Sequence, residues 1–148
     1  MVRIFAILCG IVMMGLVMGC KNTDSGSQAS VVTAADLMHH RYEIVSFNDA
    51  PVEVAGDVAI ELSFGENMHI SGKACNRFSG QSSIANGVLK APHLAATKMF
   101  CADELSNSLE STLFAMFGKG VSVSLDGEKL ILKDGDNTIV YTRRDLMQ

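Results

Sequence analysis

Apolar and polar side chains alternate over short stretches in much of the chain, a pattern typical of antiparallel strands with one buried face. Residues 59–64 show it most clearly, because Ile60, Leu62 and Phe64 alternate with polar or charged residues. A turn follows, and the chain returns in residues 68–70. We therefore expect a β-hairpin near the middle of the chain.

Three later hairpin signals have the same form, two short alternating segments joined by a tight turn. The Asn86-Gly87 pair is the strongest of them, because both residues tolerate the positive φ that a two-residue turn requires. Short strands at this spacing predict an antiparallel meander. The paired segments are 83–85 with 88–89, 121–125 with 129–133, and 129–133 with 138–142.

One segment has the period of a helix instead of a strand. We expect Asp103 to cap its start and Gly118 to end it as the C′ residue, with Lys119 beside the negative end of the helix dipole. A wide apolar stripe must face the sheet. We therefore predict an α+β fold, in which a strongly curved antiparallel β-sheet, a partial barrel built as a hairpin meander, packs on one main helix. The stripe consists of Leu105, Leu109, Leu113, Met116 and Phe117.

The segment before the first hairpin predicts a short N-terminal helix and then a strand. Thr33 and Asp36 have the spacing of a capping box, so we expect the helix to run through His40. Residues 41–48 have apolar side chains on both sides of the predicted strand, so both faces should be partly covered. The two sides carry Tyr42 with Ile44 and Val45 with Phe47.

Residues 1–19 have the layout of a lipoprotein signal peptide. Arg3 supplies a short basic start, an apolar run follows, and Val17-Met18-Gly19-Cys20 ends it with a branched residue, a small residue and a cysteine. The alternative is a retained membrane-spanning helix, but the run of about 16 residues is shorter than the roughly 20 that a bilayer requires. We expect cleavage before Cys20, whose acyl chains would anchor the protein stably.

A polar stretch without periodicity follows, so residues 20–31 are predicted to be a flexible tether and residues 32–148 a single domain. Lys21, in place of aspartate, favours the outer membrane by the sorting convention of enteric bacteria. Loss of Arg3 leaves 11 basic and 16 acidic residues, a net charge of −5. An acidic domain without a basic stripe argues against nucleic acid as a partner.

Two cysteines remain in the mature domain, because Cys9 leaves with the leader and Cys20 is used by the lipid. Cys75 and Cys101 form an even pair in an oxidising compartment, so we expect a disulfide between them. Two buried free thiols are the alternative. The cysteines lack a Cys-x-x-Cys spacing and a helix start at either thiol, which argues against redox catalysis.

The stretch around Cys75 offers further candidates. Gly72 and Gly80 would permit sharp bends of the sheet, or would leave the backbone open to a ligand. Asn76 could adopt a left-handed conformation or satisfy buried backbone groups at a bend. Arg77 could pair with a carboxylate inside the concave face or project as a recognition group. For both side chains we favour a structural network.

The sequence shows no pattern typical of a reaction centre. It contains no Gly-x-Ser-x-Gly, and Glu61 and Glu66 do not form a recognisable acid–base pair. Its four histidines and the methionines near the cysteines suit copper by type, but their spacing is not that of ligands. We therefore predict no enzymatic activity, no metal and no cofactor.

A set of motifs runs in order through the domain: His39-His40-Arg41, Phe64-Gly65-Glu66, Ile70-Ser71-Gly72, Cys75-Asn76-Arg77-Phe78-Ser79-Gly80, Asn86-Gly87, Ala96-Thr97, Met99, Cys101 and Asp145-Leu146-Met147. In these motifs the chain resembles the META-domain family, in particular its heat-shock lipoproteins of the HslJ type. The resemblance implies a small curved-sheet domain on the periplasmic side of the outer membrane, linked to heat or envelope stress, without catalytic residues or cofactor. Where HslJ-type chains have an arginine this chain has Lys98, so a bidentate contact is not expected there. Thr97 and Lys98 join Asn76 and Arg77 as candidate interaction residues.

From these observations we expect a non-enzymatic, monomeric envelope lipoprotein that acts as a binding or interaction module. Its partner would be an envelope protein or a small molecule. Two alternatives stay open. The domain could sequester an apolar compound such as an antibiotic in a cavity between the helix stripe and the sheet. It could also act as a periplasmic holdase-type chaperone, which requires an exposed apolar patch.

Overall fold

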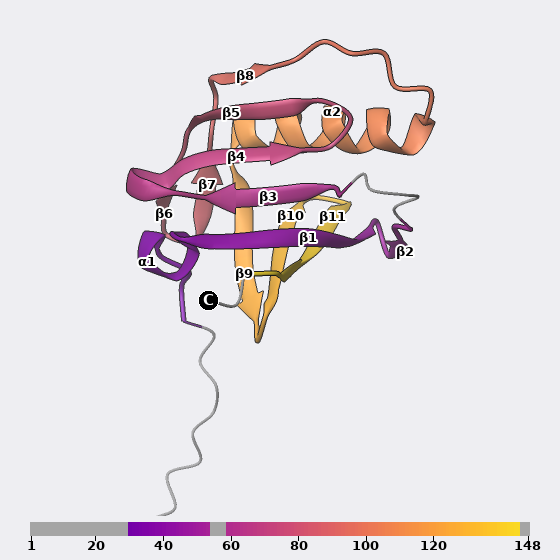
Figure 1. Ribbon diagram of the computed structural model, residues 1–148. Helices are drawn as coiled ribbons and strands as arrows, with labels where there is room; N and C mark the ends of the chain where they lie inside the picture. Colours follow the sequence, from indigo (N-terminus) through magenta and orange to yellow (C-terminus); the bar gives the residue numbers. More distant parts are fainter. Residues whose placement is uncertain (1–29, 54–58, 146–148) are drawn as a thin grey trace, which may run out of the picture.

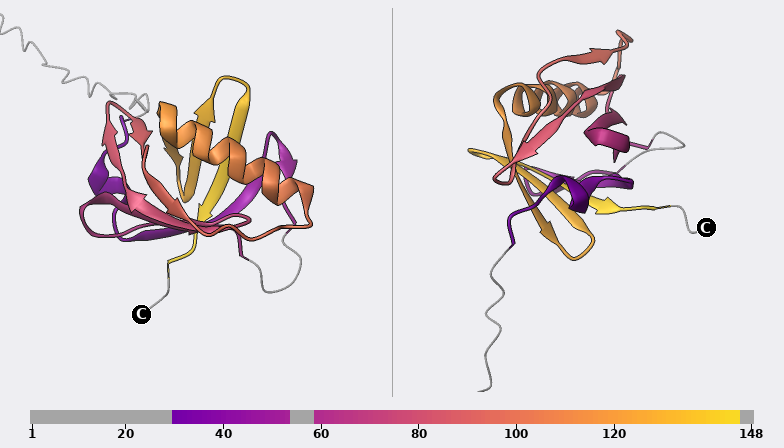
Figure 2. Two further views of the ribbon diagram at one scale, coloured as in Figure 1. Left: turned by 90° about the horizontal axis from the view of Figure 1, so that it is seen from above. Right: turned by 90° about the vertical axis from the view of Figure 1, so that its left-hand side faces the viewer.

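The computed structural model describes residues 30–53 and 59–145 (Figure 1). The predicted signal peptide, Cys20 and the predicted tether up to residue 29 lie outside the described residues. Within the described part, no helix is both long and apolar enough to cross a membrane. The architecture is a curled antiparallel sheet with one main helix and a short N-terminal helix, which confirms the predicted α+β class (Figure 2).

All strands of the described part belong to one sheet, in the order β6-β7-β9-β10-β11-β1-β3-β4-β5-β8, with β2 paired to β1. The sheet is not a simple meander, because the first long strand, β1, lies between β3 and the last strand, β11. The strands are β1 His40–Phe47, β2 Ala50–Pro51, β3 Glu61–Phe64, β4 His69–Lys73, β5 Arg77–Gln81, β6 Ser83–Ala85, β7 Val88–Lys90, β8 Leu94–Ala96, β9 Val121–Asp126, β10 Lys129–Asp134 and β11 Asn137–Arg143. The helices are α1 Ala34–Leu37, the 3₁₀ turn η1 Glu66–Met68 and α2 Glu104–Lys119.

The predicted hairpins are confirmed, because local turn chemistry determines them. Asn86 and Gly87 have φ of 50° and 72° and join β6 to β7, as a two-residue turn with positive φ requires. The β9–β10 and β10–β11 hairpins turn at Gly127 and Gly135, which also have positive φ.

The first strand differs from its prediction. A register irregularity between Ile44 and Ser46 interrupts the pairing with β11, so Val45 bulges outward and is 39% exposed. The bulge shifts the alternation by one residue, and Phe47 therefore returns to the buried side with Tyr42 and Ile44. The prediction that Phe47 lies on the face opposite Tyr42 was wrong, because a bulge cannot be read from alternation alone.

The short helix α1 starts as predicted but ends sooner. The Asp36 carboxylate accepts hydrogen bonds from the Thr33 N–H at 2.8 Å and the Thr33 hydroxyl at 2.6 Å. The helix ends at Leu37, and His40 already belongs to β1, where it pairs with Phe64. The prediction of a helix through His40 was wrong, because pairing with β3 takes over the backbone.

The main helix α2 places its apolar stripe against the concave side of the sheet. Its buried residues join one hydrophobic cluster with residues of the strands, and the Phe78 ring of β5 packs against Phe117 and edge-to-face against Phe114. Leu105 is the exception within the predicted stripe, since it is 38% exposed. The helix therefore fills the concave face. The buried helix residues are Leu109, Leu113, Met116 and Phe117.

The predicted start of α2 is confirmed and its predicted end was wrong. The Asp103 carboxylate accepts from the Leu105 N–H at 3.3 Å and the Ser106 N–H at 2.9 Å. Gly118, the expected C′ residue, lies inside the helix. The cap is Gly120, which has φ of 108° and donates its N–H to the Met116 carbonyl. Residues with a side chain rarely adopt this φ, so the backbone conformation itself favours glycine at position 120.

Candidate functional site at the strap between β8 and α2

The segment of residues 97–102, which we call the strap, connects β8 to α2 and runs over the edge of the sheet to the first turn of the helix (Figure 1). Its two large apolar side chains are poorly packed, since Met99 is 68% and Phe100 94% exposed. A disulfide joins Cys101 to Cys75 at the end of β4, with 5.9 Å between their Cα atoms, which is within the span of such a bridge. The strap is thus anchored covalently beside its most exposed residue.

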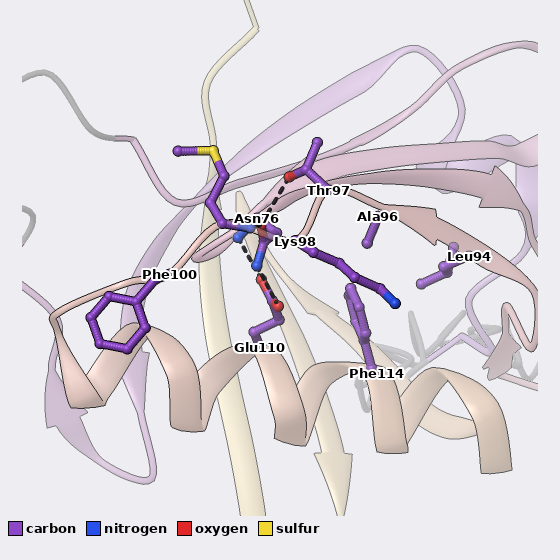
Figure 3. A pocket seen from close by; sticks show the side chains of 9 residues that line it. Asn76, Leu94, Ala96, Thr97, Lys98, Phe100, Glu110 and Phe114 are labelled. Carbon is purple, nitrogen blue, oxygen red and sulfur yellow. Dashed lines mark hydrogen bonds between the residues drawn. The ribbon is translucent and has the colours of Figure 1, made fainter.

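Asn76 is the second anchor, and it is 6% exposed. Its Oδ1 accepts from the Met99 N–H at 2.6 Å and from the Thr97 hydroxyl at 2.9 Å. Its Nδ2 donates to Glu110 Oε1 at 3.0 Å, and its backbone N–H donates to Glu110 Oε2 at 2.5 Å. One buried amide therefore links the strap, the β4–β5 turn and α2 (Figure 3).

The structure thus assigns roles to the candidates Asn76, Arg77 and Thr97. Asn76 is not among the described residues with positive φ, so the prediction that it adopts a left-handed conformation was wrong. The alternative holds, because its side-chain amide accepts from the backbone N–H of Met99. Arg77 is exposed on β5, and none of the ion pairs in residues 30–53 and 59–145 involves it. Thr97 contributes twice, because its hydroxyl also accepts from the Arg77 N–H at 3.2 Å.

The two glycines of this region do not leave backbone open to a ligand. A Cβ on Gly72 would lie 2.4 Å from the Glu61 carbonyl and 2.5 Å from the Phe78 ring. A Cβ on Gly80 would lie 2.6 Å from the His93 carbonyl. Neither residue has positive φ. Both are therefore small because neighbouring groups pack directly on their backbone.

A shallow hollow of about 590 Å³ lies between the strap, β8 and α2 (Figure 3). Lys98 lies along it toward Phe114, while Phe100 lies at the other end, apart from the Asn76–Glu110 pair. Glu110 and Phe114 come from outside the buried stripe of α2, so this hollow is not the predicted cavity between stripe and sheet. The lining residues are Asn76, Leu94, Ala96, Thr97, Lys98, Met99, Phe100, Glu110 and Phe114.

The chemistry of this hollow suits binding. Both carboxylate oxygens of Glu110 accept hydrogen bonds from Asn76. The exposed groups around it are the apolar Met99 and Phe100 and the ammonium of Lys98. Across the described residues, no group of three or more His, Cys, Asp or Glu side chains is arranged to hold a metal ion.

Sequence reasoning singled out Asn76, Thr97 and Lys98 but missed Glu110, which accepts from Asn76, and Phe100, which lines the same hollow. Glu110 is one of many acidic residues on helix surfaces, and only the fold brings it to Asn76. Phe100 had a readable signal, because it is a large apolar residue between a charged residue and a helix cap, outside both strand and helix periodicity.

A second hollow, of about 400 Å³, is lined by residues of β1, β3 and β4 and by Asp145. We call the group of Asp145, His40, Arg41 and Arg143 beside it the polar corner. Asp145 is its centre, with Oδ2 2.7 Å from His40 Nδ1 and 3.4 Å from Arg143, and Oδ1 accepting from the Arg41 N–H at 3.0 Å. Burial disfavours the charged carboxylate, but these hydrogen bonds and the charges of His40 and Arg143 outweigh it and lower the pKa of Asp145. The polar corner ties the start of β1 to the end of the domain.

A half-barrel sheet closed by one helix, with a disulfide-anchored strap, defines the class of this protein. The model of the META domain matches residues 35–145, and the chain belongs to this family, as its sequence motifs suggested. It is 40% identical over 132 residues to the heat shock protein HslJ of Escherichia coli K12, covering 89% of this chain and 91% of the relative. The chain is thus related to a heat shock protein.

Two solved NMR structures are similar to this fold. One is of a protein 42% identical to the chain, with a TM-score of 0.73, covering 79% of this chain and 99% of the solved one. The other, of a protein from Burkholderia xenovorans, has 17% identity and a TM-score of 0.59, covering 76% of this chain and 87% of the solved one. The second likeness concerns the fold alone.

Proposed function

We propose that this heat-shock-related protein is a non-enzymatic lipoprotein of the bacterial outer membrane, whose periplasmic domain binds another protein through the strap. The observation that carries the proposal is the exposure of Met99 and Phe100 on a segment fixed by a disulfide and by Asn76. An aromatic side chain held in position but left unpacked gains its contacts from a partner.

Anchoring at Cys20 completes the proposal, since a tether of about ten residues would let the domain reach proteins at the membrane surface. Mass spectrometry of the N-terminus of the protein isolated from membranes would test it. We expect acylated Cys20 as the first residue, and loss of membrane association in Cys20→Ala. An intact leader in the isolated protein would contradict the anchor.

Site-specific photo-crosslinking in cells would test the strap. A photoreactive phenylalanine analogue at Phe100 should give crosslinked products that increase after heat shock, whereas the same analogue at Leu125, an exposed apolar residue of β9, should not. Equal products from both positions would contradict binding at the strap.

The holdase alternative is favoured by the same exposed residues and predicts a different result. A holdase would suppress aggregation of a heat-denatured reporter enzyme, and Phe100→Ser would reduce the suppression, while Leu125→Ser would not. Suppression that is equal in the two variants would exclude the strap as a client-binding surface.

A further inference from the structure

The strap continues from an edge of the sheet. Strand β8 is the last in the strand order, and among the strands of the described residues it pairs only with β5. The edge of a sheet presents backbone N–H and C=O groups that can pair with another strand. The hollow in front of α2, which we call the groove, lies alongside this strand, since Leu94 and Ala96 of β8 and Phe114 of α2 all line it.

The register of β8 identifies which backbone groups point to its free edge. Ala95 pairs with Ser79, and the Thr97 N–H donates to the Arg77 carbonyl at 3.0 Å. Backbone groups of successive strand residues point to opposite sides. The N–H and C=O of Ala96 therefore point away from β5, and none of the turn, loop or side-chain hydrogen bonds within residues 30–53 and 59–145 uses the Ala96 N–H.

The walls of the groove suit an extended chain with an apolar side chain. Leu94 and Phe114 are half-buried and face the hollow from β8 and α2. Ala95 and Ala96 are small and exposed, so they do not block the approach of a second backbone. A groove between an edge strand and a helix is an arrangement in which peptides bind by strand addition.

Charge restricts the peptide further. The Lys98 side chain lies along the groove toward Phe114 (Figure 3). None of the ion pairs formed within the described ranges involves Lys98. Glu110, the acidic residue of the lining, is bonded to Asn76 at both oxygens. An acidic group on the peptide would therefore be able to pair with the Lys98 ammonium, which no carboxylate of the described residues engages.

We propose that the groove between β8 and α2 binds an extended peptide segment of a partner protein, which adds a strand to β8, places an apolar side chain between Leu94 and Phe114, and sets a carboxylate beside Lys98. The proposal rests on the proposed function and names its ligand class. It differs from strap binding in requiring backbone pairing at Ala96.

The test uses full-length protein in detergent and a fluorescein-labelled peptide of the sequence Thr-Val-Thr-Leu-Thr-Val-Asp. We expect saturable binding, and hydrogen exchange at the Ala96 N–H should slow on binding while exchange at the already paired Ala95 N–H stays unchanged. A peptide N-methylated at alternate residues on its pairing edge should bind at least about tenfold more weakly, because it lacks the donors. Equal binding of both peptides would overturn the proposal.

Two substitutions at one position provide a matched control. Ala96→Pro removes the N–H that points to the free edge and should weaken binding at least about tenfold, whereas Ala96→Ser keeps the N–H and should bind normally. If Ala96→Pro fails to fold, the N-methylated peptide still decides. Lys98→Gln should weaken binding about two- to fivefold, and replacing the peptide aspartate with asparagine should remove that difference.

Other outcomes separate the possible occupants. Protection at Ala96 that appears with rising protein concentration and no peptide would assign the edge to a second copy of this chain and overturn the proposal. Crosslinks from Phe100 without protection at Ala96 would retain the proposed function and reject strand addition. Protection and peptide binding without crosslinks from Phe100 would support the groove and reject the strap as the contact in cells.

Discussion

The strap and the polar corner solve the same problem in different ways, since each ties together segments far apart in the sequence. The polar corner joins His40 to Asp145, 105 residues apart, with side chains that remain partly exposed. The strap is joined to Cys75 and Asn76 through a disulfide and a buried amide. The polar corner is thus held by charged, partly solvent-exposed side chains, whereas the strap is held by a covalent bond and a buried amide.

The difference shows what each region leaves for other molecules. At the polar corner the charged groups of Asp145, His40 and Arg143 are already paired with each other. At the strap the buried anchors hold the backbone, so Phe100 keeps its position without packing on the domain. A fixed but unsatisfied apolar surface is what a binding site needs.

The largest expected effect comes from the disulfide. Replacing both Cys75 and Cys101 with serine should lower the free energy of unfolding by about 3 to 4 kcal/mol, because the bridge closes a loop between residues 26 apart. Urea denaturation followed by circular dichroism measures this value. Free thiols in protein isolated from cells, found by mass spectrometry, would contradict a covalent anchor.

Asn76→Ala is expected to cost about 2 to 3 kcal/mol, since it leaves the Met99 N–H and Glu110 Oε1 without their partner, although the backbone N–H of residue 76 still donates to Glu110 Oε2. The neighbouring Arg77→Ala is the control, and it should change the free energy of unfolding by under about 0.5 kcal/mol because the side chain is exposed. Equal losses in the two variants would mean that the buried amide does not anchor the strap.

The polar corner should contribute less, and its contribution should depend on pH. Because the folded pKa of Asp145 is lowered, its stabilisation is present above the ordinary carboxyl pKa of about 4 and is lost as the pH falls through the lower folded value. Asp145→Asn should therefore destabilise by about 1 kcal/mol or less at pH 7, and by less still in acid. A difference that does not shrink between pH 7 and pH 3 in urea titrations would refute this account.

Phe100→Ser should have the smallest effect on folding, within about 0.5 kcal/mol, because the ring is 94% exposed. The same variant should lose the strap-dependent binding proposed above. A marked loss of stability in this variant would show that Phe100 belongs to the fold and would remove the contrast between the two regions.

Local signals predicted the parts of the fold that depend on neighbouring residues. The Asn86-Gly87 turn, the Asp103 cap and the alternation in β3 were each readable within a few residues. The end of α2 was not, because Gly118 and Gly120 are both plausible caps. The choice of Gly120 depends on where β9 begins, since Val121 directly after it pairs with Leu89 of β7.

Only part of the candidate site could be predicted from the sequence, because the rest depends on contacts between distant residues. The Cys75-Asn76 motif and Thr97 were singled out in the sequence, but strand β8 was not, because its three residues gain their structure from pairing with β5. The exposure of Phe100 and the pairing of Asn76 with Glu110 likewise depend on contacts across 23 to 34 residues, from Asn76 to Met99 and to Glu110.

The sequence by itself determined the fold class, the main helix and the hairpins, because periodicity and turn chemistry act over short distances. Tertiary structure alone decided that β1 lies between β11 and β3, that the helix fills the concave face, and that the strap leaves the Phe100 side chain exposed. Those features arise from long-range pairing and packing, whose free energy depends on which distant groups meet.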